Sequence, residues 1–256
     1  MWVLHLKRGI WPIFKKNLMG ETRGWFLELL STIAVPLSFF LAFGLGLRGD
    51  IADVDGVPYM AFITPGLIAL TIQLEAFRSG SWNLWLSIRH HKTIDEYRIK
   101  PISMADILVG DVMSGFTLAI IKGSLVAITL LLLSPFTLTL PKLLAFLAMM
   151  LPGAVMFTCL GAVMGVVFRR PDQIAQIQSI IITPLLYLGG LFFPISRFPQ
   201  AIQNVLVWVP TTAIFEGGRQ AFLAGHCPLQ MLIGLWVLAL IAFFATVAWC
   251  EHQLRH

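Results

Sequence analysis

The sequence has little charge for its length. Of its 256 residues only 12% are Asp, Glu, Lys or Arg, whereas 57% are apolar; a soluble globular domain carries about 25% charged residues. Apolar runs of about 20 residues, the length at which a helix crosses a bilayer, recur along the chain. A soluble domain is therefore excluded, and an all-α integral membrane protein is predicted.

Cysteine is scarce as well, and the common catalytic motifs are missing. Cys159, Cys227 and Cys250 are far apart, so no disulfide framework or metal-ligand spacing follows. The dipeptide Gly-Lys never occurs, which excludes a phosphate-binding loop of the form G-x-x-x-x-G-K. The six histidines form neither a Ser-His-Asp arrangement nor a paired-His helix. We therefore expect no catalytic residue, no metal site and no cofactor bound by this chain.

The apolar runs divide the chain into two parts. Residues 1–20 place apolar side chains at helical spacing and Lys or Arg on the remaining surface, which predicts an amphipathic helix in the membrane interface. Residues 21–256 form a single transmembrane domain. Its six predicted spans are at about 25–47, 59–86, 105–133, 143–167, 174–193 and 229–249.

The segment 194–228 is apolar only in patches. Prolines and charges break it into stretches too short to cross a bilayer, and irregular backbone at membrane depth has to be buried in protein or to line a cavity. We expect two short re-entrant helices here.

Basic residues lie mainly on one side of these six spans. Twelve lie on the side of both termini and four on the other, which predicts cytoplasmic termini and a multi-pass protein of the inner, or cytoplasmic, membrane. The four on the far side are Arg48, Lys142, Arg197 and Arg219.

The longest polar stretch, "RHHKTIDEYRIKPIS" (89–103), lies between the second and third spans. Thr93 and Glu96 have the spacing of a capping box, and Pro101 ends the helix that they begin, so a short helix at 93–100 is expected. Such a helix either lies at the interface without a partner or docks into a cytoplasmic protein through Ile94, Tyr97 and the charges around them.

The chain resembles the membrane-spanning subunit of ABC-2 type exporters over essentially its whole length. Four stretches carry the resemblance: "YMAFITPGLIA" (59–69), "TIDEYRIKPISMADILVGD" (93–111), "ITPLLYLGGLFFPISRFPQAIQNV" (182–205) and "VPTTAIFEGGRQAFLAG" (209–225). The pattern "FGLGL…VDGVPYMAFITPG" looks closest to the branch that exports nodulation lipo-oligosaccharides.

This resemblance implies a division of labour between subunits. The polar stretch would be a coupling helix seated on a separate ABC ATPase, matching the family at Thr93, Asp95, Glu96 and Pro101, with Tyr97 where the family usually has a hydrophobic residue. Two ATPase subunits would bind ATP and Mg²⁺, and two permeases, here a homodimer, would enclose the pathway. The substrate would be an amphiphile such as a lipid-linked glycan, lipo-oligosaccharide, lipid or hydrophobic drug; nucleic acid is not expected as a partner.

Lys122 lies near the middle of the third span, without an acidic residue three or four positions away. A lysine at mid-bilayer costs about 2.5–3.5 kcal/mol on insertion scales, so a compensating environment is expected. Lys122 either faces the translocation pathway and attracts an anionic headgroup, or it snorkels or pairs with a glutamate of another helix.

Other charges inside spans are candidates for the same pathway. Glu75 and Arg78 can pair on one face of the second span, as structural contacts or as part of an inner gate. Glu28, one turn inside the first span, is a candidate for the inner mouth.

A candidate outer gate follows from the end of the fifth span. Gly189, Gly190 and Pro194 interrupt its helix, either as a simple termination or as a hinge. Glu216 and Arg219 have the spacing of an ion pair that would hold the re-entrant helices together.

Two other classes of protein remain as alternatives. An ATP-independent secondary transporter or channel would more often show ionisable relays in several spans, and an intramembrane lipid-modifying enzyme would need a convergent His/Asp/Glu set. A neighbouring ATPase gene would distinguish the exporter from both.

Overall fold

The computed structural model describes residues 6–21, 25–45, 54, 56–90, 104–133 and 139–255. In these ranges the regular structure is helical, apart from one isolated bridge between Val54 and Val57. The elements are α1 (Leu6–Glu21), α2 (Trp25–Phe39), η1 (Phe40–Leu45), α3 (Tyr59–Trp85), η2 (Leu86–His90), α5 (Met104–Leu133), α6 (Leu140–Val167), α7 (Pro171–Ile177), η3 (Gln178–Ile182), α8 (Thr183–Leu186), η4 (Tyr187–Leu191), η5 (Ile195–Arg197), α9 (Gln200–Leu206), α10 (Pro210–Ala224) and α11 (Leu229–Arg255).

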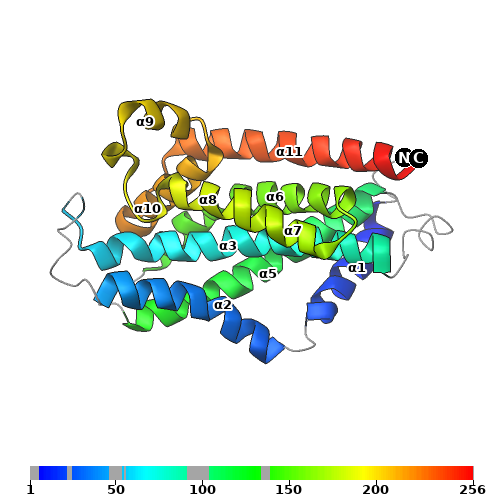
Figure 1. Ribbon diagram of the computed structural model, residues 1–256, viewed down its shortest axis with the longest axis horizontal. Helices are drawn as coiled ribbons and strands as arrows, with labels where there is room; N and C mark the ends of the chain where they lie inside the picture. The colour runs from blue at the N-terminus through cyan, green and yellow to red at the C-terminus, as the bar shows by residue number, and fades with distance from the viewer. Residues whose placement is uncertain are drawn as a thin grey trace.

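Six helical stretches in the described part of the chain are long and apolar enough to cross a membrane, which confirms the predicted all-α class and the number of spans. They are Phe26–Phe43, Tyr59–Arg89, Ala105–Leu133, Leu140–Val167, Pro171–Leu191 and Leu229–Gln253. The long helices lie side by side, with α9 at one end of the bundle, called the α9 end below, and the end of α11 at the other (Figure 1). The segment predicted as an interfacial helix contains α1, and its position at an interface stays a prediction.

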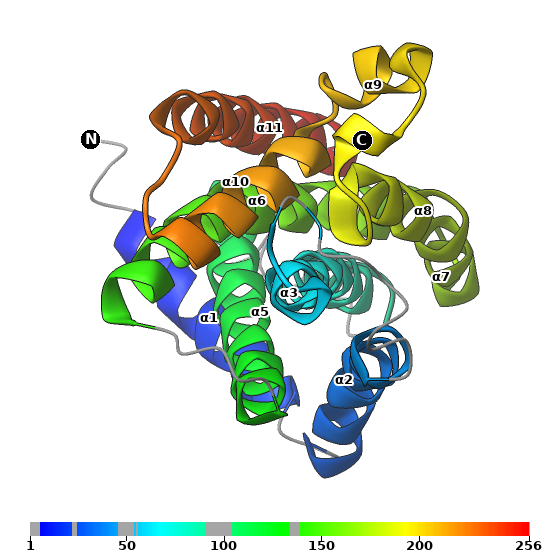
Figure 2. The ribbon, with the colours of Figure 1, turned by 90° about the vertical axis from the view of Figure 1, so that its left-hand side faces the viewer.

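Helix α3 lies in the middle of the bundle, surrounded by α2, α5, α6 and α8 in the end-on view (Figure 2). Most of its apolar side chains are buried, and so are polar ones such as Thr64, Gln73 and Ser79. A helix that is apolar all round is typical of such a central position. The central helix therefore connects all the parts of the candidate site described below.

Helices α3 and α6 approach each other backbone to backbone because glycines line their contact. A Cβ atom at Gly80 would collide with the carbonyl oxygen of Thr158, and one at Gly161 would collide with that of Phe77. Small residues at helix interfaces allow this approach in membranes, where packing rather than a hydrophobic driving force holds helices together. The α3–α6 pair is thus a tightly fitted unit.

Helices α2 and α11 are packed quite differently. Only 17% of the spanning window of each is buried, and both expose large apolar side chains such as Leu27 and Ile241. In a bilayer such faces lie against lipid or against another apolar helix. Helix α2 therefore has few neighbours to fix its position, and its polar contacts matter more.

We predict that Gly161→Val destabilises the fold. The valine side chain cannot fit against the α3 backbone, and overpacking of this kind costs about 1–3 kcal/mol or more. Thermal unfolding in detergent should give a clearly lower melting temperature. Gly234→Val on α11 is the matched control, because nothing lies within 4 Å of a Cβ at that position; equal melting temperatures for the two variants would contradict the close α3–α6 contact.

Candidate functional site

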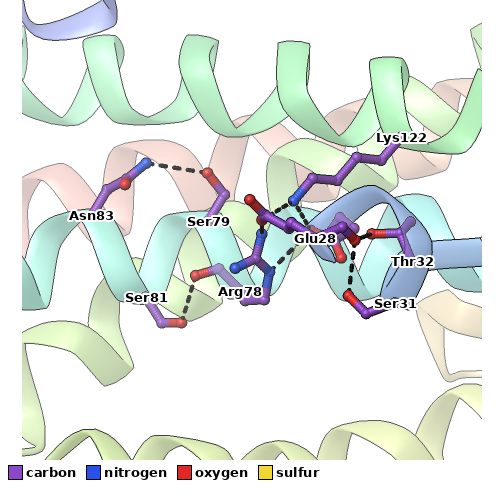
Figure 3. Close-up of polar contacts among 9 residues, drawn as sticks. Glu28, Ser31, Thr32, Arg78, Ser79, Ser81, Asn83 and Lys122 are labelled. Carbon is purple, nitrogen blue, oxygen red and sulfur yellow. Dashed lines mark hydrogen bonds and ion pairs between the residues drawn. The ribbon is translucent and has the colours of Figure 1, made fainter. Parts of the chain in front are cut away.

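Four charged side chains from three spans meet inside the bundle (Figure 3). Lys122 of α5 places its Nζ 2.6 Å from Oε1 of Glu28 on α2 and 2.8 Å from Oε2 of Glu75 on α3. Arg78 of α3 contributes a second cation: its Nε lies 3.0 Å from Oε2 of Glu75, and its Nη2 pairs with Oε1 of Glu28. These four residues are called the charge cluster below.

Burial within the charge cluster decreases from the lysine outwards. The side chain of Lys122 is only 4% exposed and that of Glu75 14%, whereas those of Glu28 and Arg78 are 24% and 37% exposed. Lys122 lies 11 residues before the end of α5, which is about 16 Å along a helix. Because a charge so placed is costly without partners, the two carboxylates supply the compensation that the sequence led us to expect.

Local structure positions Glu28 for this contact. It lies in the first turn of α2, where the helix dipole favours a negative charge. The hydroxyls of Ser31 and Thr32 both donate to its backbone carbonyl, at 2.8 and 2.9 Å. The carboxylate of Glu28 is directed toward Arg78 of α3 and Lys122 of α5.

Of the two expectations for Lys122, the structure shows the pairing with glutamates of other helices. The predicted pair of Glu75 and Arg78 is present on α3. Glu28, a candidate for the inner mouth, joins the same cluster, and its place at that mouth stays a prediction. All four candidate pathway residues thus come together, and their contact with a substrate stays a prediction.

The fifth span is interrupted at Gly190, as predicted. Its φ of 102° lies in the region that only glycine adopts readily, and two carbonyls near the break are bound by side chains from other elements. Arg219 of α10 donates to the carbonyl oxygen of Gly190. The hydroxyl of Tyr59 on α3 donates to the carbonyl oxygen of Phe192 at 3.3 Å. Gly190 is one residue before the end of this span, and the backbone carbonyls left open at a helix end need partners of this kind.

The predicted pair of Glu216 and Arg219 stays a prediction, and the structure shows Arg219 in contact with two other elements. Its guanidinium lies 3.6 Å from the centre of the Phe62 ring, in cation–π contact, and its Nε donates to the Phe62 carbonyl at 3.4 Å. A planar donor fork can serve two carbonyls and an aromatic face at once, so Arg219 joins α10 to the end of the fifth span and to α3. Of the other candidates for the outer gate, Gly189 packs against Thr211 of α10, and Pro194 precedes η5.

Sequence reasoning missed a polar contact between α1 and α5. The side-chain amide of Asn17 donates to Oδ1 of Asp111 at 2.6 Å and to the hydroxyl of Ser114 at 2.9 Å, and all three are buried. Nearby, Nζ of Lys16 donates to the Ser87 hydroxyl at 2.9 Å; burial lowers the pKa of this lysine, while Asp111 acts in the opposite direction. The signal in the sequence was an aspartate inside a span with a serine one turn later.

The predicted coupling residues Thr93, Ile94, Asp95, Glu96, Tyr97 and Pro101 lie outside the described residues. Their helix and its role stay predictions.

Comparisons with known proteins cover most of the chain. A sequence profile described as "ABC-2 type transporter" matches residues 8–223. The chain is similar to "Inner membrane transport permease YadH" of Escherichia coli (strain K12), with 28% identity over 91% of this chain and 90% of that protein. It is also similar to "Nodulation protein J" of Sinorhizobium fredii, with 23% identity over 94% and 92% of the two chains. The protein of the same name from Rhizobium leguminosarum bv. viciae is 26% identical over 77% and 76%.

We predict that Lys122→Met destabilises the protein by about 3–5 kcal/mol, because it leaves two carboxylates in the bundle without their buried cation. Unfolding in a denaturing detergent measures the change. Lys15→Met, an exposed lysine of α1, is the control and should change stability little. Adding Glu75→Gln to Lys122→Met removes the excess negative charge of the cluster and should recover part of the lost stability. If the double variant recovers none, the pairing of Lys122 with Glu75 is contradicted.

We further predict that Arg219→Lys loosens the break in the fifth span. Lysine keeps the charge but loses the fork and the stacking on Phe62. Hydrogen bonds from charged donors contribute about 1.5–3 kcal/mol, so amide hydrogen exchange at residues 187–193 should be at least about tenfold faster. Arg197→Lys, at an exposed arginine of the same outer segment, should leave these rates unchanged.

Proposed function

The chain belongs to the ABC-2 type transporter family, and on that premise we propose that it is the membrane-spanning permease subunit of an ATP-driven exporter. Its substrate is an amphiphile of the class of lipid-linked glycans, lipo-oligosaccharides, lipids or hydrophobic drugs, moved out of the cytoplasm or the inner leaflet. The observation that carries this proposal is the family match over residues 8–223, which includes the first five of the six spanning helices.

The energy source in this proposal is a separate subunit. The chain has no phosphate-binding loop, so two ABC ATPase subunits bind ATP and Mg²⁺ and dock at residues 89–103. Two permeases form a homodimer around the pathway. The ATPase acts on the permease by changing how the docked helix packs in a groove of the ATPase. Packing changes of this kind move gates between discrete states.

The charge cluster suggests how such a movement reaches the pathway. It joins the start of α2 to α3 and α5, while the α9 end of this span is held by ring contacts of Phe39 and Phe43 with Phe192. Between these two contacts α2 is weakly buried. In our proposal α2 is the element that shifts during transport. Its movement changes the ion pairs of Arg78, the most exposed residue of the cluster.

The membrane in question is the inner membrane, with both termini in the cytoplasm. This is supported by the name of the Escherichia coli relative and by the twelve basic residues on the terminal side of the spans. The rhizobial relatives are named as nodulation proteins, and the sequence resembles the branch that exports nodulation lipo-oligosaccharides, so a lipo-oligosaccharide is the first substrate to test.

The proposal predicts that the permease, purified with a candidate ABC ATPase subunit, forms a stable complex whose ATP turnover rises with substrate. Glu96→Ala and Tyr97→Ala should lower complex formation and stimulated turnover at least about tenfold, as expected when a contact of about 1.4 kcal/mol or more is lost. Turnover is measured in nanodiscs against extracts of lipo-oligosaccharide, phospholipid and hydrophobic drugs.

Gln253→Ala is the matched control, because Gln253 is an exposed polar residue at the end of the bundle opposite α9. Normal copurification and turnover in all three variants would place the ATPase contact elsewhere. Transport that persists without any ATPase would overturn the exporter proposal and favour a secondary transporter or channel.

A further inference from the structure

One carboxylate oxygen joins the two cations of the charge cluster. Oε1 of Glu28 contacts both Lys122 and Arg78 (Figure 3), and Oε2 of Glu75 contacts the same two cations from α3. The two carboxylates and two cations balance each other. Without the carboxylate of Glu28, two cations would lie beside one carboxylate, and the cluster would carry a net charge of +1.

The two carboxylates belong to helices that are packed very differently. Glu75 is on α3, the central helix of the bundle (Figure 2), whose spanning window is 78% buried. Glu28 is on α2, whose spanning window is 17% buried. Because helices in a bilayer are held by packing against their neighbours, a shift of α2 breaks far fewer contacts than the same shift of α3. Glu28 is therefore the carboxylate that can move away from the two cations.

The side of the cluster that Glu28 occupies is also its accessible side. Glu28 and Arg78 are the two most exposed members. Beside Glu28 on α2, Phe26, Leu27 and Leu30 are exposed by 65%, 72% and 56%. An amphiphile in the bilayer can therefore bring its headgroup to the position of Glu28 while its chain stays among apolar side chains and lipid.

We propose that the position of the Glu28 carboxylate is a binding site for the anionic headgroup of the exported amphiphile. When α2 shifts, the headgroup takes the place of Glu28 between Lys122 and Arg78, and Glu28 returns when the headgroup leaves. This proposal rests on the function proposed above, in which α2 moves, and it adds the charge of the substrate.

The chemistry of the two cations defines the ligand class. A lysine supplies a point charge and an arginine a planar donor fork, a combination that suits phosphate, sulfate and carboxylate groups. A headgroup with a single negative charge, such as a phosphodiester, restores the neutrality of the cluster. A neutral headgroup would leave Lys122 and Arg78 with one carboxylate between them, which is costly where charges are buried. The cluster therefore selects anionic amphiphiles over neutral or cationic ones.

The experiment uses Glu28→Gln, which keeps the shape of the side chain and removes its charge. The purified full-length permease in a non-ionic detergent is titrated with phosphatidylglycerol or with phosphatidylcholine, and native mass spectrometry counts the lipids bound. Glu28→Gln should bind phosphatidylglycerol at least about fivefold more tightly than the wild type does, the change expected from one basic charge near a lipid surface. The affinity for phosphatidylcholine, whose headgroup has no net charge, should stay the same.

Two further variants separate this site from general effects of charge. Asp172→Asn also removes a carboxylate from an ion pair, but from the exposed pair with Arg170, and should leave the binding of phosphatidylglycerol unchanged. Adding Arg78→Gln to Glu28→Gln returns the cluster to a net charge of zero and should abolish the gain. Equal affinities of Glu28→Gln and the wild type, or a gain that persists in the double variant, would overturn the proposal.

Competition distinguishes an amphiphile from a free anion. Inorganic phosphate at the same concentration should leave phosphatidylglycerol bound to Glu28→Gln, because it lacks the chain that partitions beside α2. If inorganic phosphate displaces the lipid, the site takes the free anion and its assignment to an amphiphile is wrong.

Melting temperatures identify variants that do not fold. If Glu28→Gln does not fold, Glu75→Gln replaces it, since it leaves the same net charge of +1 and should also gain affinity for phosphatidylglycerol. None of these measurements uses the ATPase. A lack of headgroup binding would leave the copurification and turnover experiments as tests of the exporter, and a lack of ATPase association would overturn the exporter without changing the lipid affinities expected here.

Discussion

The first three spans depend on mutual compensation of charge inside the bundle. Two carboxylates and two cations meet there, and the most deeply buried of them, Lys122, has contacts with both glutamates. The lysine, of which only 4% is exposed, could not be held there singly without a large cost. Because α2 has few apolar neighbours within the chain, these ion pairs also fix where the first span begins. The charge cluster thus serves the fold as well as any part it has in transport.

The two parts of the candidate site differ in what holds them. The charge cluster is a set of side chains from different helices, whereas the interruption at Gly190 is a feature of the backbone whose carbonyl groups are bound by Arg219 and Tyr59. Helix α3 contributes to both, through Glu75 and Arg78 at one level and through Tyr59 and Phe62 at the other. A tightly packed α3–α6 pair therefore provides the common framework on which both depend.

Sequence reasoning identified the spans because hydropathy acts over long windows, and it identified Lys122 because one charge in an apolar run is conspicuous. It could not choose between pairing and exposure to a pathway, since the partner Glu28 is 94 residues away. It paired Arg219 with Glu216 from local spacing, and it could not identify the carbonyl and the aromatic ring that other elements offer to Arg219. The contact of Asn17 with Asp111 was missed for the same reason: an aspartate inside a span indicates a buried partner, but local spacing does not encode which helix supplies it.

The order of the cluster's members along the chain has a consequence for how the protein is made. Glu28, Glu75 and Arg78 enter the membrane with the first two spans, and Lys122 follows with the third. The two carboxylates and one guanidinium of the first two spans leave a net negative charge. This charge attracts the third span, whose insertion is otherwise opposed by its lysine. The charge cluster therefore couples the first three spans to one another, whereas the later spans supply none of its four residues.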